Sequence, residues 1–129
     1  MYAHINEVNI AGIGVATCIT ANKEMIAELI DNLCNNAIRY NNKNGSVMVE
    51  VGAHEGHAFL RVKDTGIGIP KEHQERVFER FYRVDKSRSK QTGGTGLGLA
   101  IVKHVVAIHN ASLSLESEEG KGTEITVTF

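Results

Sequence analysis

The chain has 129 residues, enough for one ordinary hydrophobic core, and this length predicts a single domain over residues 1–129. Its 14 basic and 15 acidic side chains nearly cancel, so the composition gives no sign of nonspecific nucleic-acid binding. Two cysteines make no disulfide framework, which favours a reducing cytosol, and no apolar run is long enough to cross a membrane.

Two short strands are expected at the start of the chain. Residues 4–10 and 13–19 are rich in apolar, β-prone side chains, although their alternation is imperfect. We expect the two strands to be separated around Gly12 and Gly14.

Residues 22–40 change to a helical period. Asn22 is a suitable N-cap for this helix. Apolar residues recur at steps of three and four and predict one buried face: Ile26, Leu29, Ile30, Leu33 and Ala37. A polar stripe borders that face, because at about 100° per residue its members span a third of the circumference: Glu28, Asn32, Asn36, Arg39 and Tyr40. The i, i+4 register of Asn32 and Asn36 favours a ligand-facing role, whereas Asn35 points further round and is expected to be solvated.

A hairpin follows and ends in a glycine-rich turn. Residues 41–45 are a turn by composition, and residues 47–51 and 57–64 alternate as two strands. The second strand ends at Asp64 and leads into DTGIGIP, residues 64–70. Two glycines two apart let the backbone turn tightly and approach a ligand, while the carboxylate accepts hydrogen bonds. A plain glycine-rich turn is the alternative.

The segment after this turn is predicted to cover a binding site. Residues 71–78 could form a short helix, and residues 78–95 are expected to form a lid, because this charge-dense stretch has no periodicity. Phe78 and Phe81 are expected to anchor the lid to the body. Arg83 is the expected phosphate contact among its cations, most of which solubility alone would explain.

A second glycine-rich stretch, GGTGLGLA at residues 93–100, opens another helix. Its apolar positions are Ile101, Val102, Val105, Val106 and Ile108. Glycines at a helix start leave backbone N–H groups free to face an anion, so a phosphate cradle is favoured over a flexible hinge. The stretch matches neither the P-loop nor the dinucleotide fingerprint. Residues 111–117 and 122–129 are expected to close the domain as a second hairpin.

These elements together predict an α+β fold. Strands come in hairpin-like pairs, which indicates a mixed, mostly antiparallel sheet in a two-layer sandwich. We expect three helices on one face of this sheet and a ligand cleft between the helices and the lid.

Four stretches occur in an order that resembles the ATP-binding catalytic domain of sensor histidine kinases, in the gyrase, chaperone, histidine kinase and MutL superfamily. They are NLCNNAIRY at 32–40, DTGIGIP at 64–70, FERFYR at 78–83 and GTGLGL at 94–99. They look like that family's N box, first glycine box, F box and second glycine box. The resemblance implies a Bergerat-type fold and a two-component protein histidine kinase that binds Mg-ATP and transfers the γ-phosphoryl group to a histidine on a separate dimerisation domain.

The resemblance also implies roles for individual residues. Asp64 looks like the carboxylate that accepts from the adenine amino group, and Asn36 like the magnesium ligand. Arg39 stands where a cation would reach the phosphates, and Tyr40 where a ring would pack on the base. The other implied nucleotide contacts lie in the glycine boxes, the lid and the last strand: Gly66, Gly68, Ile69, Arg83, Gly94, Thr95, Gly96, Leu97, Gly98, Leu99 and Thr123, the last acting through water.

Asn32 departs from the related ATPases of the gyrase and chaperone type. There a glutamate four residues before the metal asparagine activates water, whereas Asn32 carries an amide that cannot be a general base at neutral pH. Glu28, one turn earlier, is a less favoured base. We therefore expect Asn32 and Arg83 at the reacting phosphate, with positioning and charge neutralisation supplying the catalysis.

The six histidines include no match to the family's phosphoacceptor motif. The expected partners are therefore the phosphoacceptor helices of the full-length kinase and a downstream response regulator, not nucleic acid, and the fragment is not expected to autophosphorylate alone. We expect a cytoplasmic domain of a membrane-anchored bacterial sensor, whose sensor and dimerisation domains lie outside this chain. A serine-kinase or ATPase relative and a non-catalytic nucleotide-binding module remain as alternatives.

Overall fold

The computed structural model describes residues 2–5, 8–14, 19, 21–82 and 97–129. The elements, in chain order, are β1 (Tyr2–Ile5), β2 (Val8–Gly14), α1 (Lys23–Arg39), β3 (Ser46–His54), β4 (His57–Asp64), the 3-10 helix η1 (Lys71–His73), α3 (Gly98–Ile108), β5 (Ser112–Glu118) and β6 (Gly122–Thr128). The strands form one sheet in the order β1-β2-β3-β4-β6-β5. β2 pairs with β3 in parallel and the other neighbours are antiparallel, which confirms the expected mixed sheet.

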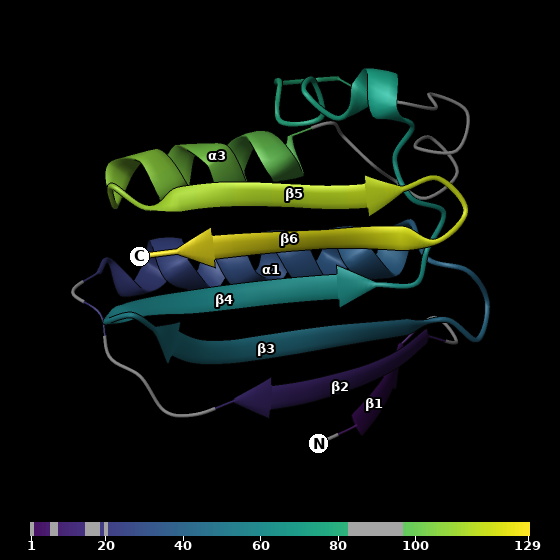
Figure 1. The fold of residues 1–129 in the computed structure, drawn as a ribbon, viewed down its shortest axis with the longest axis horizontal. Coiled ribbons are helices and arrows are strands. Elements are labelled where there is room, and N and C mark those ends of the chain that lie inside the picture. The colour runs from purple at the N-terminus through teal and green to yellow at the C-terminus, as the bar shows by residue number, and fades with distance from the viewer. Residues whose placement is uncertain (1, 6–7, 15–18, 20, 83–96) are drawn as a thin grey trace.

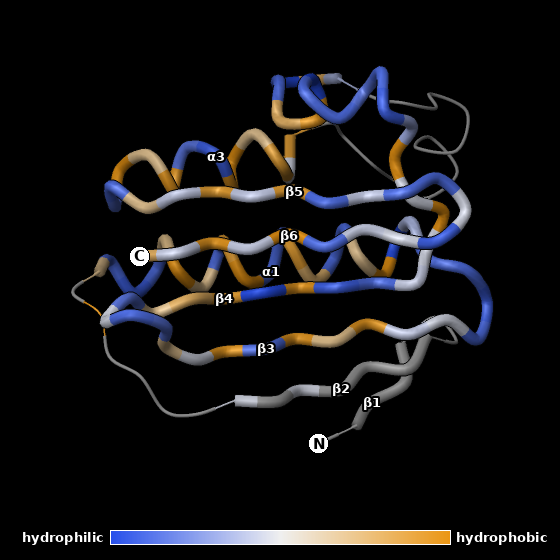
Figure 2. Tube along the Cα trace, viewed as in Figure 1, coloured by the Kyte–Doolittle hydropathy of each residue, from blue (hydrophilic) through white to orange (hydrophobic). Residues whose placement is uncertain are grey.

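Both described α-helices cover one face of the sheet, so the molecule has two layers. Figure 1 shows α1 passing behind β4 and β6 and α3 running along β5. Alternate residues of a strand share a face, and Figure 2 shows the resulting change between hydrophobic and hydrophilic residues along β5 and β6. The core between the layers is apolar and fully enclosed: Leu29, Leu33, Ala37, Val47, Leu60, Val62, Val102, Val105, Val106, Ile125 and Val127. No helix within the described residues is long and apolar enough to span a bilayer.

The first helix begins as predicted. The Asn22 side chain accepts a hydrogen bond from the Met25 N–H at 3.0 Å, so it satisfies one of the unpaired donors of the first turn. The Asn22 N–H in turn donates to Nε2 of His109 at 3.2 Å. This bond ties the start of α1 to the end of α3, which shows that the two helices run antiparallel.

The separation of two strands expected around Gly12 and Gly14 is wrong, because β2 continues through Gly12 and ends at Gly14. The cause is the parallel partner, since Gly14 lies opposite Val51 of β3. A Cβ at Gly14 would come within 2.8 Å of the Val51 carbonyl oxygen, so the glycine allows close strand contact rather than a break. Residues 15–18 lie outside the described residues.

The helix expected at residues 71–78 is much shorter, the 3-10 helix η1 over Lys71–His73. The chain forms η1 and then successive turns, in which N–H groups donate to carbonyls three residues earlier, as from Arg76 to His73 at 3.0 Å and from Glu79 to Arg76 at 2.9 Å. Such 3-10 bonding is used in short pieces. Val77 is the residue of this segment that is buried, so no periodic apolar face exists to support an α-helix.

Some apolar residues predicted to be buried are exposed. Phe81 is 63% exposed and has a left-handed φ of 66°, which turns its ring away from the body, whereas Val77 is only 8% exposed and anchors this segment. Ile108 at the end of α3 is 53% exposed. Ile30 is 37% exposed, because it lies about 200° round α1 from Asn32, on the flank away from α3.

Candidate functional site

Three polar side chains form a transverse row at one end of the sheet, and we call them the inner polar row: Asp64 of β4, Thr123 of β6 and Ser117 of β5. Asp64 is opposite Thr123, and Thr123 is opposite Ser117. The neighbouring row on the same face is apolar and packs in the core: Val62, Ile125 and Leu115. The inner polar row therefore lies on the helix-covered face, directly beyond the core.

Asp64 is held through one of its two carboxylate oxygens. Oδ1 accepts from the Gly66 N–H at 2.8 Å and from the Thr123 N–H at 3.2 Å. Oδ2 receives no hydrogen bond from the described residues. Burial raises the pKa of Asp64 from 3.8 to about 6, and the two backbone hydrogen bonds oppose that shift. The geometry thus leaves a fixed carboxylate oxygen that can accept from a ligand.

The first glycine box is tied to the end of α1 and to the β5–β6 hairpin. The Ile67 N–H donates to the Tyr40 carbonyl at 3.1 Å, and the Ile67 carbonyl accepts from the Gly120 N–H at 2.7 Å. A Cβ at Gly66 would collide with the Tyr40 carbonyl oxygen. Gly68 has a φ of 71°, and a Cβ there would collide with a hairpin carbonyl. Both positions therefore require glycine.

Asn41, which composition predicted to lie in a turn, is a buried structural residue. It is 8% exposed, its Nδ2 donates to the Ser46 carbonyl at 2.9 Å, and its Oδ1 accepts from the Asn42 N–H at 2.8 Å. The Asn42 side chain donates to the Thr65 carbonyl at 3.1 Å. These bonds fix the segment after Tyr40 against the start of the first glycine box.

The polar stripe of α1 points where the helical period predicts. Asn32, Asn36 and Arg39 are half-buried, as is Tyr40 just beyond the helix, whereas Asn35 is exposed. The side chain of Asn36 makes no hydrogen bond to the part of the chain that the structure describes. Its amide oxygen is therefore available to a ligand.

Asn32 of the N box lies next to Gly98 of the second glycine box. Its Nδ2 donates to the Glu28 carbonyl at 2.9 Å, and its Oδ1 would lie 3.2 Å from a Cβ on Gly98. Gly98 is the first residue of α3, so the absence of a side chain there lets the start of α3 approach α1. Glu28 itself is exposed.

Four of the predicted contacts, Arg83, Gly94, Thr95 and Gly96, lie outside the described residues. Leu97 immediately precedes α3, and Leu99 packs against the core from its first turn. The described glycine boxes, the end of α1 and the last hairpin thus meet at one end of the sheet.

The comparisons with known proteins agree with this arrangement. The family model described as "Histidine kinase-, DNA gyrase B-, and HSP90-like ATPase" matches residues 21–129. The chain belongs to this family.

Similar proteins within the family include sensor histidine kinases. The chain is 46% identical over 113 residues to sensor histidine kinase WalK of Bacillus subtilis strain 168, covering 86% of the chain and 18% of WalK. The solved mycobacterial sensor histidine kinase MprB has a TM-score of 0.82 and 29% identity, covering 95% of the chain and 81% of the MprB chain. Full-length ShkA in complex with AMPPNP has a TM-score of 0.76 and 27% identity, covering 94% of the chain and 25% of ShkA. The fold is thus that of a histidine kinase catalytic, ATP-binding domain.

Ser117 is a residue of this histidine kinase domain that the sequence analysis missed. Its Oγ accepts from the Ile69 N–H at 2.8 Å and lies 2.8 Å from Thr123 Oγ1. Gln74 supports the same place, because its Nε2 donates to the carbonyls of Ile69 at 2.9 Å and Ser117 at 3.1 Å. The alternation of β5 could have revealed Ser117, since it continues the inward positions of Leu113 and Leu115.

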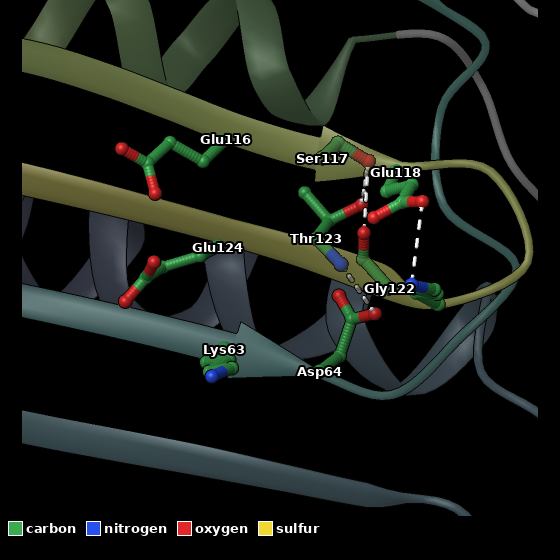
Figure 3. Close-up of a pocket in the computed structure, with 9 residues that line it drawn as sticks. Lys63, Asp64, Glu116, Ser117, Glu118, Gly122, Thr123 and Glu124 are labelled. Atoms are coloured by element: carbon green, nitrogen blue, oxygen red, sulfur yellow. Dashed lines mark hydrogen bonds and ion pairs between the residues drawn. The ribbon is translucent and has the colours of Figure 1, made fainter.

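The other face of the same strand ends carries an outer charged row, Lys63, Glu124 and Glu116, which are opposite one another in β4, β6 and β5. A hollow of about 290 Å³ is lined by both rows together with Glu118, Lys121 and Gly122. Figure 3 shows Asp64, Thr123, Ser117 and Gly122 joined by hydrogen bonds at its edge. Because the outer charged row faces away from the helices, this hollow does not correspond to the expected cleft of the kinase domain between helices and lid.

Proposed function

We propose that this domain binds Mg-ATP on the helix-covered side of the sheet and transfers the γ-phosphoryl group to a histidine on a separate dimerisation domain. The observation that carries the proposal is the carboxylate of Asp64. Two backbone N–H groups hold Oδ1, while Oδ2 is left to accept from a ligand at the meeting point of α1, the first glycine box and the β5–β6 hairpin. Such an acceptor suits the amino group of adenine.

The base end of the proposed site is built from rigid parts. Asp64 accepts from the adenine amino group, the Thr123 hydroxyl supports that contact, and Tyr40 packs on the ring. Ile69 and Leu99 supply apolar walls, and the glycines of the first box bring the backbone close to the base. This division of apolar walls and few polar groups is usual for ligand pockets.

The residues present fit a magnesium ion at the phosphate end. Asn36 offers a hard amide oxygen that is free of other described residues, on the half-buried side of α1. The described residues contain no cluster of three or more His, Cys, Asp or Glu side chains that could hold a metal. A single protein ligand nonetheless suits Mg²⁺, because this ion keeps several waters and is bound through nucleotide phosphates. When bound, it would neutralise charge on the phosphates.

Transfer of the γ-phosphoryl group, rather than hydrolysis of ATP, is proposed because Asn32 stands where the related ATPases have a water-activating glutamate. Its amide donates to a main-chain carbonyl and faces Gly98, so it offers no basic atom. Glu28 is exposed and lies one turn away. We assign Asn32 to positioning, and Arg39 and Arg83 to neutralising phosphate charge, with residues 78–95 as the lid.

The partners are proposed from the sensor kinases that the chain resembles. The chain spans 18% of WalK. We propose the phosphoacceptor helices of the full-length kinase and a downstream response regulator as its partners. We propose that the 129 residues form one catalytic domain of a cytoplasmic region in a membrane-anchored sensor.

Calorimetric titration tests the first step. ATP with Mg²⁺ should release heat and raise the unfolding temperature, and ATP with a chelator should bind more weakly. If the nucleotide gives neither heat nor a thermal shift, the proposal fails.

Mixing the domain with separately made phosphoacceptor helices and γ-labelled ATP tests the second step. Label on a histidine of the helices is the expected result. Label on a serine would instead indicate a serine-kinase relative, and phosphate release without label would indicate an ATPase. Binding of ATP without either would indicate a non-catalytic nucleotide-binding module.

A further inference from the structure

The hydroxyl group of Ser117 is saturated by three partners. It lies 2.8 Å from the Ile69 N, 2.9 Å from the Gly122 carbonyl oxygen and 2.8 Å from Thr123 Oγ1. A serine hydroxyl has one proton to donate and two lone pairs that accept. All three contacts can be hydrogen bonds only if one uses the hydroxyl proton and the other two use one lone pair each.

The positions of the protons follow from that count. The Ile69 N–H can only donate, and the Gly122 carbonyl can only accept, so the single Ser117 proton goes to Gly122. The remaining contact then requires Thr123 to donate its own hydroxyl proton to Ser117. Thr123 Oγ1 consequently has only lone pairs left for any further partner.

Thr123 lies beside Asp64 in the inner polar row, and its N–H holds the Asp64 carboxylate at 3.2 Å. An ionised carboxylate has only acceptors. With its proton fixed on Ser117, the Thr123 hydroxyl has only acceptors as well. The two groups together present an acceptor-only edge on the helix-covered face.

We propose that Ser117 is a specificity-determining positioning residue, which holds Thr123 as an acceptor and so makes the site discriminate against purines with a carbonyl at position 6. The inference rests on the proposed ATP binding. A 6-amino group brings N–H donors to an acceptor-only edge, whereas a 6-carbonyl brings further lone pairs. A site built for one hydrogen-bond pattern rejects the other because its buried polar groups are left unpaired.

The test compares ATP with inosine triphosphate, which has a carbonyl in place of the 6-amino group. In Ser117→Ala the Thr123 hydroxyl is free to rotate and donate to that carbonyl. We expect the ratio of the two dissociation constants, inosine triphosphate to ATP, to fall about tenfold. Ser114→Ala is the matched control, because Ser114 is exposed on the opposite face of the same strand; its ratio should equal that of the wild type.

A purely structural role for Ser117, through its bond to Ile69, gives a different result. Both nucleotides would then weaken by the same factor and the unfolding temperature would fall, while the ratio of dissociation constants stayed at the wild-type value. That outcome overturns the inference.

Thr123→Val provides a second variant, in case Ser117→Ala does not fold. Valine keeps the branched shape but removes the oxygen, so the ratio should fall here too, and Ser117→Ala should add nothing further in the Thr123→Val background. An unchanged ratio of dissociation constants in Thr123→Val overturns this inference but leaves the proposed ATP binding intact. Failure of the wild-type domain to bind ATP at all would overturn the proposed function and this inference with it.

Discussion

The inner polar row and the outer charged row occupy the same ends of β4, β6 and β5, one residue apart in each strand. The inner polar row faces the helices and is bonded to the first glycine box. In the outer charged row, Lys63 and Glu116 are exposed to solvent. Glu124 is half-buried and forms an ion pair with Arg61 at 3.2 Å. The comparison shows that the face of the strand, rather than the polarity of the residue, decides which groups are bonded to the first glycine box and which are exposed.

The energetic difference follows from solvation. Exposed ion pairs contribute little, because water and salt screen the charges. A buried polar group interacts strongly with whatever fills its remaining hydrogen-bond capacity, because the alternative is to leave it unpaired. Most of the predictions below therefore compare an inward residue with an outward one.

The largest expected effect comes from Asp64→Asn. The Gly66 and Thr123 N–H groups require an oxygen at the Oδ1 position, so the amide nitrogen must take the place of Oδ2 and face the adenine amino group with its own protons. ATP affinity should fall about 100-fold, and inosine triphosphate should become the better ligand. Calorimetry measures both constants.

Asp31→Asn is the control for that substitution, since Asp31 is exposed on α1 and undergoes the same chemical change. It should leave both affinities unchanged. Equal ATP affinity in Asp64→Asn and wild type would remove Asp64 from the proposed role.

The raised pKa of Asp64 predicts two opposite dependences on pH. Protonation favours the folded state, because the folded pKa of about 6 exceeds 3.8. The contribution to folding stability, on the order of 3 kcal/mol, should be complete below pH 3.8 and lost as pH rises through about 6. ATP binding needs the ionised form, so affinity should rise about tenfold per pH unit up to about pH 6 and then level off.

The ratio of wild-type to Asp64→Asn affinity isolates this effect, because protonation of the nucleotide phosphates cancels in it. Chemical unfolding at pH 4 and pH 8 measures the change in the free energy of unfolding that the Asp64 carboxyl causes. A ratio that stays constant between pH 5 and pH 7 would contradict the assignment.

Asn36 and Asn35 form an inward and outward pair on α1. Asn36→Ala should remove the gain in ATP affinity that Mg²⁺ provides, a loss of about tenfold, because the amide oxygen is the proposed protein ligand. Asn35→Ala should retain the full gain, because Asn35 is exposed. Titrations with and without Mg²⁺ measure the gain; an intact magnesium dependence in Asn36→Ala would refute the role.

The smallest expected effect concerns residues 77–81, where the proposed lid begins. Val77→Ala should lower the free energy of unfolding by about 1–2 kcal/mol, because Val77 is buried. Phe81→Ala should change it by less than about 0.5 kcal/mol despite the larger side chain, because Phe81 is 63% exposed. Denaturant unfolding measures both values, and the reverse order would contradict the packing described for this segment.

Much of the fold is predictable where the pattern within one segment decides the structure. The strand at residues 57–64 was predicted to the residue, because alternation and turn residues mark both its ends. The Asn22 cap and the directions of Asn32, Asn36 and Asn35 follow from the helical period alone.

The errors arise where a distant partner or a backbone conformation decides. β2 includes Gly12 and Gly14 because β3, far along the chain, pairs with it in parallel. Phe81 has an aromatic side chain that composition would place inside, yet its left-handed backbone turns it outward. Asn41 looks like its polar neighbours in sequence, yet its bonds to the Ser46 carbonyl and the Asn42 N–H belong to a buried part of the structure. The roles of the candidate site residues stay predictions. The substitutions at Asp64, Asn36 and Ser117 test them.

The turn between β5 and β6 has a practical meaning for protein engineering. Exposed glycine-containing turns usually tolerate spliced-in sequences. Here Gly120 is bonded to Ile67, and Gly68 packs against the Glu118 carbonyl, so the turn and the first glycine box move as one body. A reporter domain inserted at residues 119–121 would therefore displace the Asp64 loop, which makes this turn unsuitable for tagging and well suited to an artificial switch whose added domain controls nucleotide capture.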